Sequence, residues 1–320
     1  MVLIISNERD SVTDLVVDSL KRTGVVFFRL NTDSLLTNSE FGFSISPNIL
    51  THFSQYGKLL DLSKITSVWY RRPIMPKTKI KSVIEKRFAE REILATIDTL
   101  WRVLDKCFWI NSPWSIKDAS NKFHQLQVAC ELGLQVPETL ITNNYMAVED
   151  FFRTCEGSML YKPITSGHLS SQSSRIQLMT YSTLIKRGDL AKMKLVKNCP
   201  GMFQRYIEKQ YEVRVTIVGN RVFSAKIDSQ RYLEKRIDWR KGKYIKGIFT
   251  KCEIPVDLEE KLKMFLKRFD LKFGAFDLIV NKSGKYIFLE CNPNGEWAWI
   301  EDCTGMPITD TLINLLVEGK

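Results

Sequence analysis

Histidine is scarce in this sequence of 320 residues, and the three present, His52, His124 and His168, lie far apart. Zinc sites and the Ser-His-Asp triad of hydrolases both depend on imidazole groups, so the sequence argues against either. Any chemistry in this chain is therefore expected to depend on carboxylates, lysines and arginines.

Paired cysteines and long apolar runs are also lacking. The seven cysteines are odd in number and scattered, without a CxxC motif, which is typical of reduced thiols in a cytosol. The N-terminal run MVLIISNERD has neither the basic start nor the long apolar core of a signal peptide. No run approaches the roughly 18 apolar residues that a membrane helix needs. We therefore expect a soluble cytoplasmic protein without a membrane contact.

Acidic residues are outnumbered: 36 Asp and Glu stand against 47 Lys and Arg, a net charge of +11. Such an excess favours nucleic acid, an anionic membrane or small anionic ligands. More than half of it lies in residues 235–251, where seven Lys or Arg stand against Asp238 alone, a net +6. This concentration in one short stretch favours a local role with anionic ligands.

The pattern of the first 110 residues predicts a parallel α/β domain. Strands are expected from short apolar runs, and helices from apolar residues at helical spacing. A β-α-β opening implies a parallel sheet. The predicted strands are residues 2–6, 25–30, 65–70 and 108–110, and the predicted helices are residues 10–23 and 79–104.

The pattern of residues 111–320 predicts an α+β portion. We divide it into a central domain at 111–202 and a C-terminal domain at 203–320. A helix is expected at 115–132, and antiparallel hairpins dominate later. Other predicted elements are strands at 139–142 and 159–162 and a helix at 257–269.

A hairpin that carries carboxylates is predicted near the C-terminus. Two β-rich runs flank Ser283-Gly284, a turn signal. With these two residues as the loop, Asp277 lies opposite Glu290, their Cβ atoms about 5 Å apart, and Asn292 shares the face of Glu290. Two carboxylates and an amide oxygen suit Mg²⁺, or Mn²⁺. The alternative is the exposed acidic face of an ordinary hairpin.

Two lysines are candidates for holding phosphate groups. Lys162 ends an apolar strand and precedes a Ser/Gly-rich loop, where backbone N–H groups are available to an anion. Lys122 lies on the helix that leads into the preceding strand. The alternative for each is a solvated surface charge.

A second hairpin has Gly219-Asn220 as its turn and carries charged residues within apolar strands. In this register Glu212, Arg214 and Thr216 share one face. Either this face lines a site, or it holds a cross-strand ion pair in solvent.

Several motifs, taken in order, resemble those of the ATP-grasp superfamily over residues 115–310. They are NK..QLQ.A..LGL.VP.T (121–139), YKP (161–163), FQ.YIE (203–208), EVRV..VG (212–219), GAFDLIV (274–280) and FLECNPNGEW (288–297). With WYRRP (69–73) and DWR (238–240), nearly the whole chain resembles the graspetide synthetases, the microviridin-type ligases that make side-chain macrocycles in ribosomal peptides.

The resemblance implies an ATP-grasp fold with an N-terminal pre-ATP-grasp domain and assigns roles to individual residues. Lys122 and Lys162 match the nucleotide lysines. Gln204, Arg205, Tyr206 and Ile207 match the hinge that reads adenine, and Glu212 is the candidate for the ribose. Asp277, Glu290 and Asn292 match the magnesium triad. The implied catalytic residues are Arg214, Arg240 and Lys162, and the implied substrate contacts are Arg71, Arg72, Asp238 and Arg240; Arg71 and Arg72 could instead pair at a domain interface.

The resemblance also implies ATP with Mg²⁺, a precursor peptide made of leader and core, and a homodimer. Phosphoryl transfer to an Asp or Glu side chain would be followed by attack of a Ser or Thr hydroxyl or a Lys amine. The apolar residues within 181–199 could dock the leader or pack in the core. The alternatives are a ligase that adds an amino acid to a free acceptor, a non-catalytic ATP-binding module, and a nucleic-acid binder. The last would explain the charge but not the predicted metal ligands.

Overall fold

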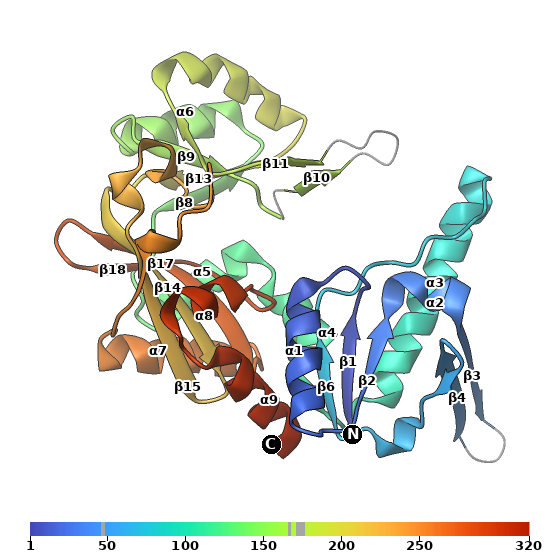
Figure 1. The fold of residues 1–320 in the computed structure, drawn as a ribbon. Coiled ribbons are helices and arrows are strands. Elements are labelled where there is room, and N and C mark those ends of the chain that lie inside the picture. The colour runs from blue at the N-terminus through green and yellow to red at the C-terminus, as the bar shows by residue number, and fades with distance from the viewer. Residues whose placement is uncertain (46–48, 166–167, 171–176, 320) are drawn as a thin grey trace. The chain divides into compact units, whose positions relative to one another are not determined.

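The computed structural model describes the whole chain except residues 46–48, 166–167, 171–176 and 320. Two compact units make up the fold (Figure 1). The first comprises Met1–Ser115, Asp270–Phe273 and Pro307–Lys320, and the second comprises Ile116–Phe269 and Gly274–Met306. The first unit thus takes in the C-terminal helix α9 (Ile308–Glu318). The division into three domains at residues 110 and 202 stays a prediction.

A four-stranded parallel sheet lies at the centre of the first unit, in the order β2-β1-β6-β7. Its strands are β1 (Val2–Ser6), β2 (Phe27–Asn31), β6 (Ser67–Tyr70) and β7 (Phe108–Ile110). All five residues of β1 are buried, as expected for a strand whose sheet is covered on both faces. The sequence-based prediction of a parallel α/β domain is confirmed.

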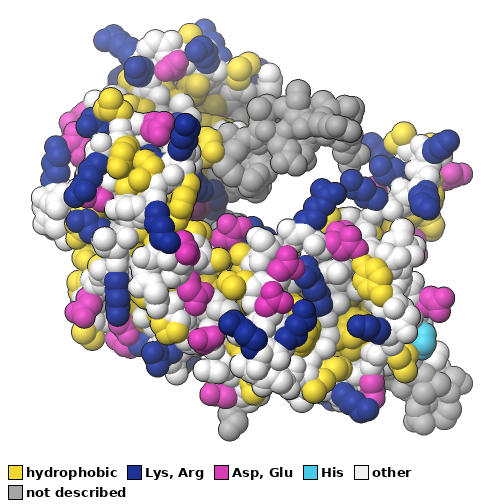
Figure 2. All heavy atoms as spheres, viewed as in Figure 1, with side chains coloured by type: hydrophobic (Ala, Val, Ile, Leu, Met, Phe, Trp, Pro, Cys, Tyr) yellow, Lys and Arg dark blue, Asp and Glu magenta, His cyan; other side chains and the backbone are white. Residues whose placement is uncertain are grey.

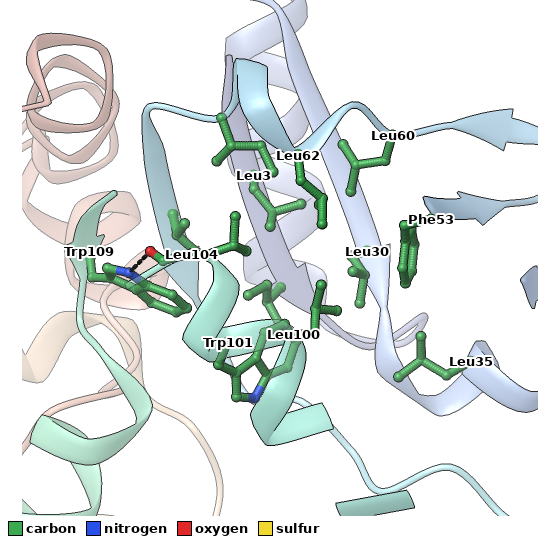
Figure 3. Packing of buried hydrophobic residues seen from close by; sticks show 13 residues of the cluster. Leu3, Leu30, Leu35, Phe53, Leu60, Leu62, Leu100, Trp101, Leu104 and Trp109 are labelled. Atoms are coloured by element: carbon green, nitrogen blue, oxygen red, sulfur yellow. Dashed lines mark hydrogen bonds between the residues drawn. The ribbon is translucent and has the colours of Figure 1, made fainter. Parts of the chain in front are cut away.

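Helices α1 (Ser11–Arg22) and α3 (Val83–Val103) form the outer layers of this unit together with α9. Asp10 precedes α1 and caps it, because its side chain accepts a hydrogen bond from the Thr13 N–H. The last turns of α3 pack Leu100 and Trp101 against Leu3 in one apolar core (Figure 3). Helix α9, which the sequence did not predict, contacts both α1 and β6.

The sequence-based prediction also missed a small antiparallel sheet, which is formed by the part of the chain that follows β2 and precedes β6. It consists of β3 (Ser39–Ile45), β4 (Ile49–Gln55) and β5 (Lys58–Leu59), and it follows the short helix α2 (Leu35–Asn38). The buried side chain of Gln55 joins it to the end of β2, accepting from Asn31 N at 2.9 Å and donating to Asn31 O at 2.8 Å. Phe53 joins the core of the unit (Figure 3).

One sheet of the second unit has four antiparallel strands in the order β12-β9-β13-β8. These are β8 (Thr139–Thr142), β9 (Met159–Lys162), β12 (Thr183–Ile185) and β13 (Gly201–Arg205). Helix α6 (Tyr145–Thr154) and the 3-10 helix η3 (Arg187–Lys197) pack on it through one apolar core. Strands β10 (His168–Ser170) and β11 (Gln177–Met179) pair separately.

The apolar residues proposed for leader docking divide between core and surface. Ile185 is buried in the core of α6 and η3, and Leu190 packs against it. Leu195 is exposed. Core packing therefore accounts for Ile185 and Leu190, whereas a docking role for this segment stays a prediction.

The other sheet of the second unit has five strands in the order β16-β15-β14-β17-β18. They are β14 (Lys209–Val218), β15 (Arg221–Ile227), β16 (Phe249–Lys251), β17 (Phe273–Asn281) and β18 (Tyr286–Asn292). Helix α7 (Val256–Arg268) packs on it through Phe265, whose ring lies 5.5 Å from that of Phe276 and 5.2 Å from that of Phe288. Helix α8 (Ala298–Thr304) follows β18. The antiparallel α+β prediction is confirmed.

The prediction of a single helix at residues 115–132 is wrong. Two helices occur instead, α4 (Pro113–Ala119) and α5 (Lys122–Glu131). The Asn121 side chain accepts a hydrogen bond from His124 N at 3.1 Å and so starts the second helix. The break sets Lys122 at the first position of α5.

The surface bears charges of both signs. On the face shown in Figure 2, Lys and Arg side chains are interspersed with Asp and Glu side chains. In the described part of the chain, no helix has both the length and the hydropathy that crossing a membrane requires.

Candidate functional site

The β17–β18 hairpin brings the predicted carboxylate pair together, although its turn differs from the predicted one. Asn281 N donates to Lys285 O at 3.0 Å and Gly284 N donates to Asn281 O at 3.0 Å, so the loop has three residues instead of two. Gly284 has φ +78°, the left-handed region that glycine tolerates.

A β-bulge restores the predicted pairing of Asp277 with Glu290, although the loop is longer than predicted. The longer loop shifts the pairing next to the turn by one residue, with Leu278 opposite Phe288. The register shifts again between Leu278 and Asp277, which leaves Leu289 unpaired and sets Asp277 opposite Glu290. Asn292 follows opposite Ala275 on the same face as Glu290. The predicted pairing is confirmed, but it depends on the bulge.

Each carboxylate of the pair has a cationic partner. Arg214 Nη1 lies 2.9 and 2.8 Å from the two carboxylate oxygens of Asp277. Lys122 Nζ lies 3.4 Å from Glu290 Oε2. Burial would raise the pKa of Glu290, but Lys122, Lys162 and Arg240 outweigh burial and lower it. Glu290 therefore stays ionised beside Asp277.

The donor set fits a hard divalent cation. An ionised carboxylate has about four lone-pair positions, of which Arg214 uses two at Asp277. The remaining carboxylate oxygens and the Asn292 amide are oxygen ligands of the kind that Mg²⁺ prefers. Among the described residues, no group of three or more His, Cys, Asp or Glu side chains could hold a metal ion. The amide oxygen is therefore an essential part of the candidate set.

Strand β14 contributes a buried face to the same sheet. The register with β15 sets Glu212 opposite Ile227 and Arg214 opposite Ala225, as predicted. Glu212, Arg214 and Thr216 are all buried, so an ion pair on a solvated face is ruled out. Glu212 Oε2, Arg214 Nε and Thr216 Oγ1 are buried without a hydrogen-bond partner in the part of the chain that the structure describes. Unsatisfied polar atoms of this kind suit a ligand.

Gly295 is required where the chain passes Arg214. A Cβ at this position would lie 2.4 Å from Ala275 Cβ and 2.7 Å from Arg214 Nη2. The absence of a side chain thus lets Arg214 reach both Asp277 and the Glu296 carbonyl, to which it donates at 3.3 Å.

The two predicted phosphate lysines lie close to this hairpin. Lys122 Nζ donates to Pro163 O at 3.1 Å, directly after Lys162 at the end of β9. Burial lowers the pKa of Lys162 to about 8, and Lys122 and Lys209 add to this, against the opposing effect of Glu290 and Asp238. The Ser/Gly-rich loop that follows lies partly outside the described residues. The two lysines together supply positive charge that suits an anion.

Lys209 is a site residue that sequence reasoning missed. Its side chain is buried, pairs with Glu212 and donates to Ile237 O at 3.1 Å. Burial raises the pKa of Glu212, and Lys209 offsets only part of this effect. Residues three apart in a strand normally face opposite sides, so the sequence offered no signal for this pair.

The DWR segment forms an internal ion pair. Arg240 Nε donates to Asp238 Oδ1 at 2.8 Å and Nη2 donates to Oδ2 at 2.7 Å. Burial would raise the pKa of Asp238, but Arg240 outweighs burial and lowers it. The hydrogen bonds to Asp238 raise the pKa of Arg240, and Asp277 and Glu290 add to this effect. Arg240 is therefore close enough to the carboxylate pair to interact with it.

The predicted hinge residues form the end of β13 and the start of the segment that joins it to β14. Gln204 Nε2 donates to Thr139 Oγ1 at 3.0 Å, and Arg205 Nη2 lies 3.1 Å from Glu138 Oε2. Tyr206 N donates to Ser158 O at 2.7 Å. The contact with adenine predicted for these residues and Ile207 stays a prediction.

Arg71 and Arg72 belong to the first unit. Arg71 is 1% exposed, and its Nε lies 3.3 Å from Asp10 Oδ2. Arg72 is exposed and has φ +47°, and its carbonyl accepts from Asn7 Nδ2 at 2.8 Å. Burial of Arg71 beside the cap of α1 indicates a structural role there. A substrate contact for either residue stays a prediction.

Comparison with known proteins shows which proteins this chain resembles. The model of the MvdD pre-ATP grasp domain matches residues 1–117. The macrocyclase MdnC of Microcystis aeruginosa MRC, solved with precursor peptide MdnA, is 28% identical with a TM-score of 0.88, over 100% of both chains. The macrocyclase MdnB of the same strain is 29% identical with a TM-score of 0.84, over 99% of both chains. The chain is thus similar to the graspetide synthetases of the ATP-grasp superfamily over its whole length, and to their pre-ATP grasp domain over residues 1–117.

Three further relatives extend the comparison. A RiPP-associated ATP-grasp ligase of Chryseobacterium gregarium, solved with ADP and a leader and core peptide, is 25% identical with a TM-score of 0.91, over 100% of this chain and 97% of that one. The N-acetylaspartylglutamate synthases A of mouse and man are each 24% identical, over 75% and 68% of this chain. These matches span 64% and 56% of the two curated relatives, less than two thirds of their length.

Proposed function

We propose that this protein is a graspetide synthetase, which uses ATP to join an Asp or Glu side chain of a ribosomal precursor peptide to a Ser or Thr hydroxyl, or to a Lys amine. The observation that carries the proposal is the carboxylate pair Asp277 and Glu290 within a cluster of cations. That arrangement suits two anionic reactants, and two of the relatives described above, MdnC and the Chryseobacterium gregarium ligase, were solved with peptides.

In the first step, the γ-phosphoryl group would pass from ATP to a peptide carboxylate oxygen, and ADP would leave. Because both reactants are anions, Lys162, Arg214 and Arg240 would neutralise their encounter. Asp277, Glu290 and Asn292 would hold Mg²⁺, with Mn²⁺ as a substitute, and the bound ion would neutralise charge on the phosphate oxygens. Lys122 would be released from Glu290 toward the phosphates.

In the second step, the hydroxyl oxygen or amine nitrogen of the peptide would attack the acyl carbon. Phosphate leaves, and the nucleophile gives up a proton to solvent or phosphate, so each ring removes one water from the peptide. Acyl phosphates hydrolyse, so this step requires exclusion of water. The buried β14 face would bind the nucleotide, with Glu212 toward the ribose and residues 204–207 toward adenine. Asp238, Arg71 and Arg72 remain candidate contacts to the peptide.

Mass spectrometry after incubation with ATP, Mg²⁺ and the short precursor encoded beside the gene tests the proposal. We expect the loss of one water per ring, and ester rings should reopen in mild base whereas amide rings should not. No mass loss with a cognate precursor that binds would refute the macrocyclase function.

A second candidate is a ligase that adds a free amino acid to a carboxylate acceptor, which the match to the two N-acetylaspartylglutamate synthases favours. The same assay separates the two functions. ADP release that needs the precursor peptide supports the macrocyclase, whereas release with free amino acids alone supports the second candidate. We expect either reaction in the cytoplasm, because all seven cysteines are free thiols.

We also propose a homodimer, for which helix α3 offers a surface. Its first turns expose Val83, Ile84, Phe88 and Leu94, and Ile84 is 83% exposed. In an antiparallel pair of α3 helices centred on Phe88, Glu85 of each copy would face Arg91 of the other. Such a pairing buries the apolar residues and matches the charges.

Light scattering tests this assembly. F88E should give a monomer, whereas V26E, which changes an exposed apolar residue elsewhere in the same unit, should not. E85R or R91E alone should weaken the dimer, and the E85R/R91E double variant should restore it. A wild-type monomer at micromolar concentration would refute the homodimer without bearing on the reaction.

A further inference from the structure

A buried lysine with no role in the proposed reaction lies beneath the DWR segment. Lys235, the last residue of the 3-10 helix η5 (Leu233–Lys235), is 2% exposed. Its ammonium group donates to Trp239 O at 3.2 Å and to Lys241 O at 2.6 Å. Among the described residues, no carboxylate lies within ion-pair distance of it. A charge buried in this way is costly unless its hydrogen bonds are well made.

These two carbonyls flank Arg240 on either side in the chain. We infer that Lys235 is a positioning residue, which fixes the backbone on both sides of Arg240 and so directs its guanidinium toward the site. An ammonium can donate several hydrogen bonds at once, which lets one side chain hold two carbonyls together. Hydrogen bonds from a charged donor are also about twice as strong as neutral ones.

Other contacts hold the same segment from different directions. Lys209 donates to Ile237 O at 3.1 Å, and the Trp239 ring lies 4.9 Å from that of Trp299. Gly242 has φ +74°, and a Cβ there would lie 2.2 Å from the Glu234 carboxyl carbon. Several contacts thus hold segment 237–242 in one conformation, and Lys235 is the residue that binds both neighbours of Arg240.

The inference rests on the proposed role of Arg240 in phosphoryl transfer. If Lys235 acts through Arg240, K235M should lower kcat on the order of tenfold to a hundredfold, because small misplacements of a catalytic group have effects of this size. The KM for ATP should change less than twofold. The matched control is K243M, which removes an exposed lysine of the same segment and should leave kcat unchanged.

A double-mutant cycle with R240A provides the decisive test. In the R240A background, K235M should lower kcat less than twofold further, because the group that it positions is already gone. A loss as large as in the wild-type background would overturn the inference, as would a K235M kcat equal to that of K243M. If K235M does not fold, K235Q, which keeps an N–H donor but no charge, is subjected to the same criteria.

Trypsin cleavage after Arg240, followed by mass spectrometry, separates this inference from the proposed function. Full turnover by R240A would refute the catalytic role of Arg240. Faster cleavage of K235M than of K243M would then still support the inference that Lys235 fixes the backbone around Arg240. Equal cleavage of the two variants would overturn that inference.

Discussion

ATP binding is expected to weaken as the pH rises from 7 to 9, because Lys162 loses its proton in that range. Burial lowers its pKa from the ordinary 10.5 to about 8, with Lys122 and Lys209 adding to the effect. Bound phosphates would favour the charged lysine and so raise its pKa again. The free enzyme is then ~90% protonated at this residue at pH 7 and only ~10% at pH 9.

This change in occupancy sets the size of the effect. The dissociation constant of ATP should increase about tenfold between pH 7 and 9, equivalent to ~1.4 kcal/mol. At pH 8, binding should take up about half a proton per ATP, since half of the lysines are neutral. Phosphate groups are already mostly deprotonated throughout this range, so they contribute little.

Isothermal titration calorimetry in two buffers of different ionisation enthalpy measures both the affinity and the proton uptake. The matched control is K162R, because arginine keeps its charge throughout; its affinity should not change with pH. A wild-type affinity that is the same at pH 7 and 9 would refute the reasoning. An equal slope in K162R would assign the proton to another group.

The lowered pKa of Lys162 also makes the stability of the ATP-free enzyme depend on pH. Between pH 8 and 10.5 the unfolded chain holds the Lys162 proton more tightly than the folded chain does. Stability contributed by this residue therefore increases as the pH rises through that window.

Four further variants follow from the site and the core. Asp277→Ala and Glu290→Ala should each abolish Mg²⁺-dependent ADP release. If a higher Mg²⁺ concentration alone restored turnover, these residues would contribute only to the affinity for Mg²⁺. Gly295→Ala should lower kcat on the order of tenfold or more by displacing Arg214, while circular dichroism stays unchanged; a normal kcat would show that the loop adapts. Phe265→Ala should lower the free energy of unfolding by about 3–5 kcal/mol in urea titration, since its ring is fully buried; a loss below 1 kcal/mol would indicate that the core closes around the cavity.

The carboxylate hairpin shows how a correct contact can follow from an incomplete derivation. Alternation of side chains and the Ser283-Gly284 turn signal predicted that Asp277 faces Glu290, and the structure has this pairing. The loop is one residue longer than predicted, and the unpaired Leu289 corrects the register. A turn signal identifies where the chain reverses, but bulges depend on packing across the whole sheet.

The helix break before Lys122 and the pair between Lys209 and Glu212 mark the limits of periodicity. Apolar spacing continued through residues 115–132, yet α4 ends at Ala119 and the Asn121 side chain caps the start of α5. Lys209 and Glu212 would lie on opposite faces of a regular strand, so only the folded chain brings them together. In each case a local hydrogen bond or ion pair outweighs the regular pattern.

The sequence by itself determined the parallel α/β start, the antiparallel remainder, the candidate ligand residues and, through its motifs, the resemblance to the graspetide synthetases. These follow from periodicities and short motifs, which are local properties of the chain. Only the tertiary structure decided which charges are satisfied internally. It pairs Arg71 with Asp10, Arg214 with Asp277 and Lys122 with Glu290, and it buries Lys235 beneath the DWR segment. The physical reason is that a charge far along the chain can be neutralised only by residues that folding brings within a few ångströms.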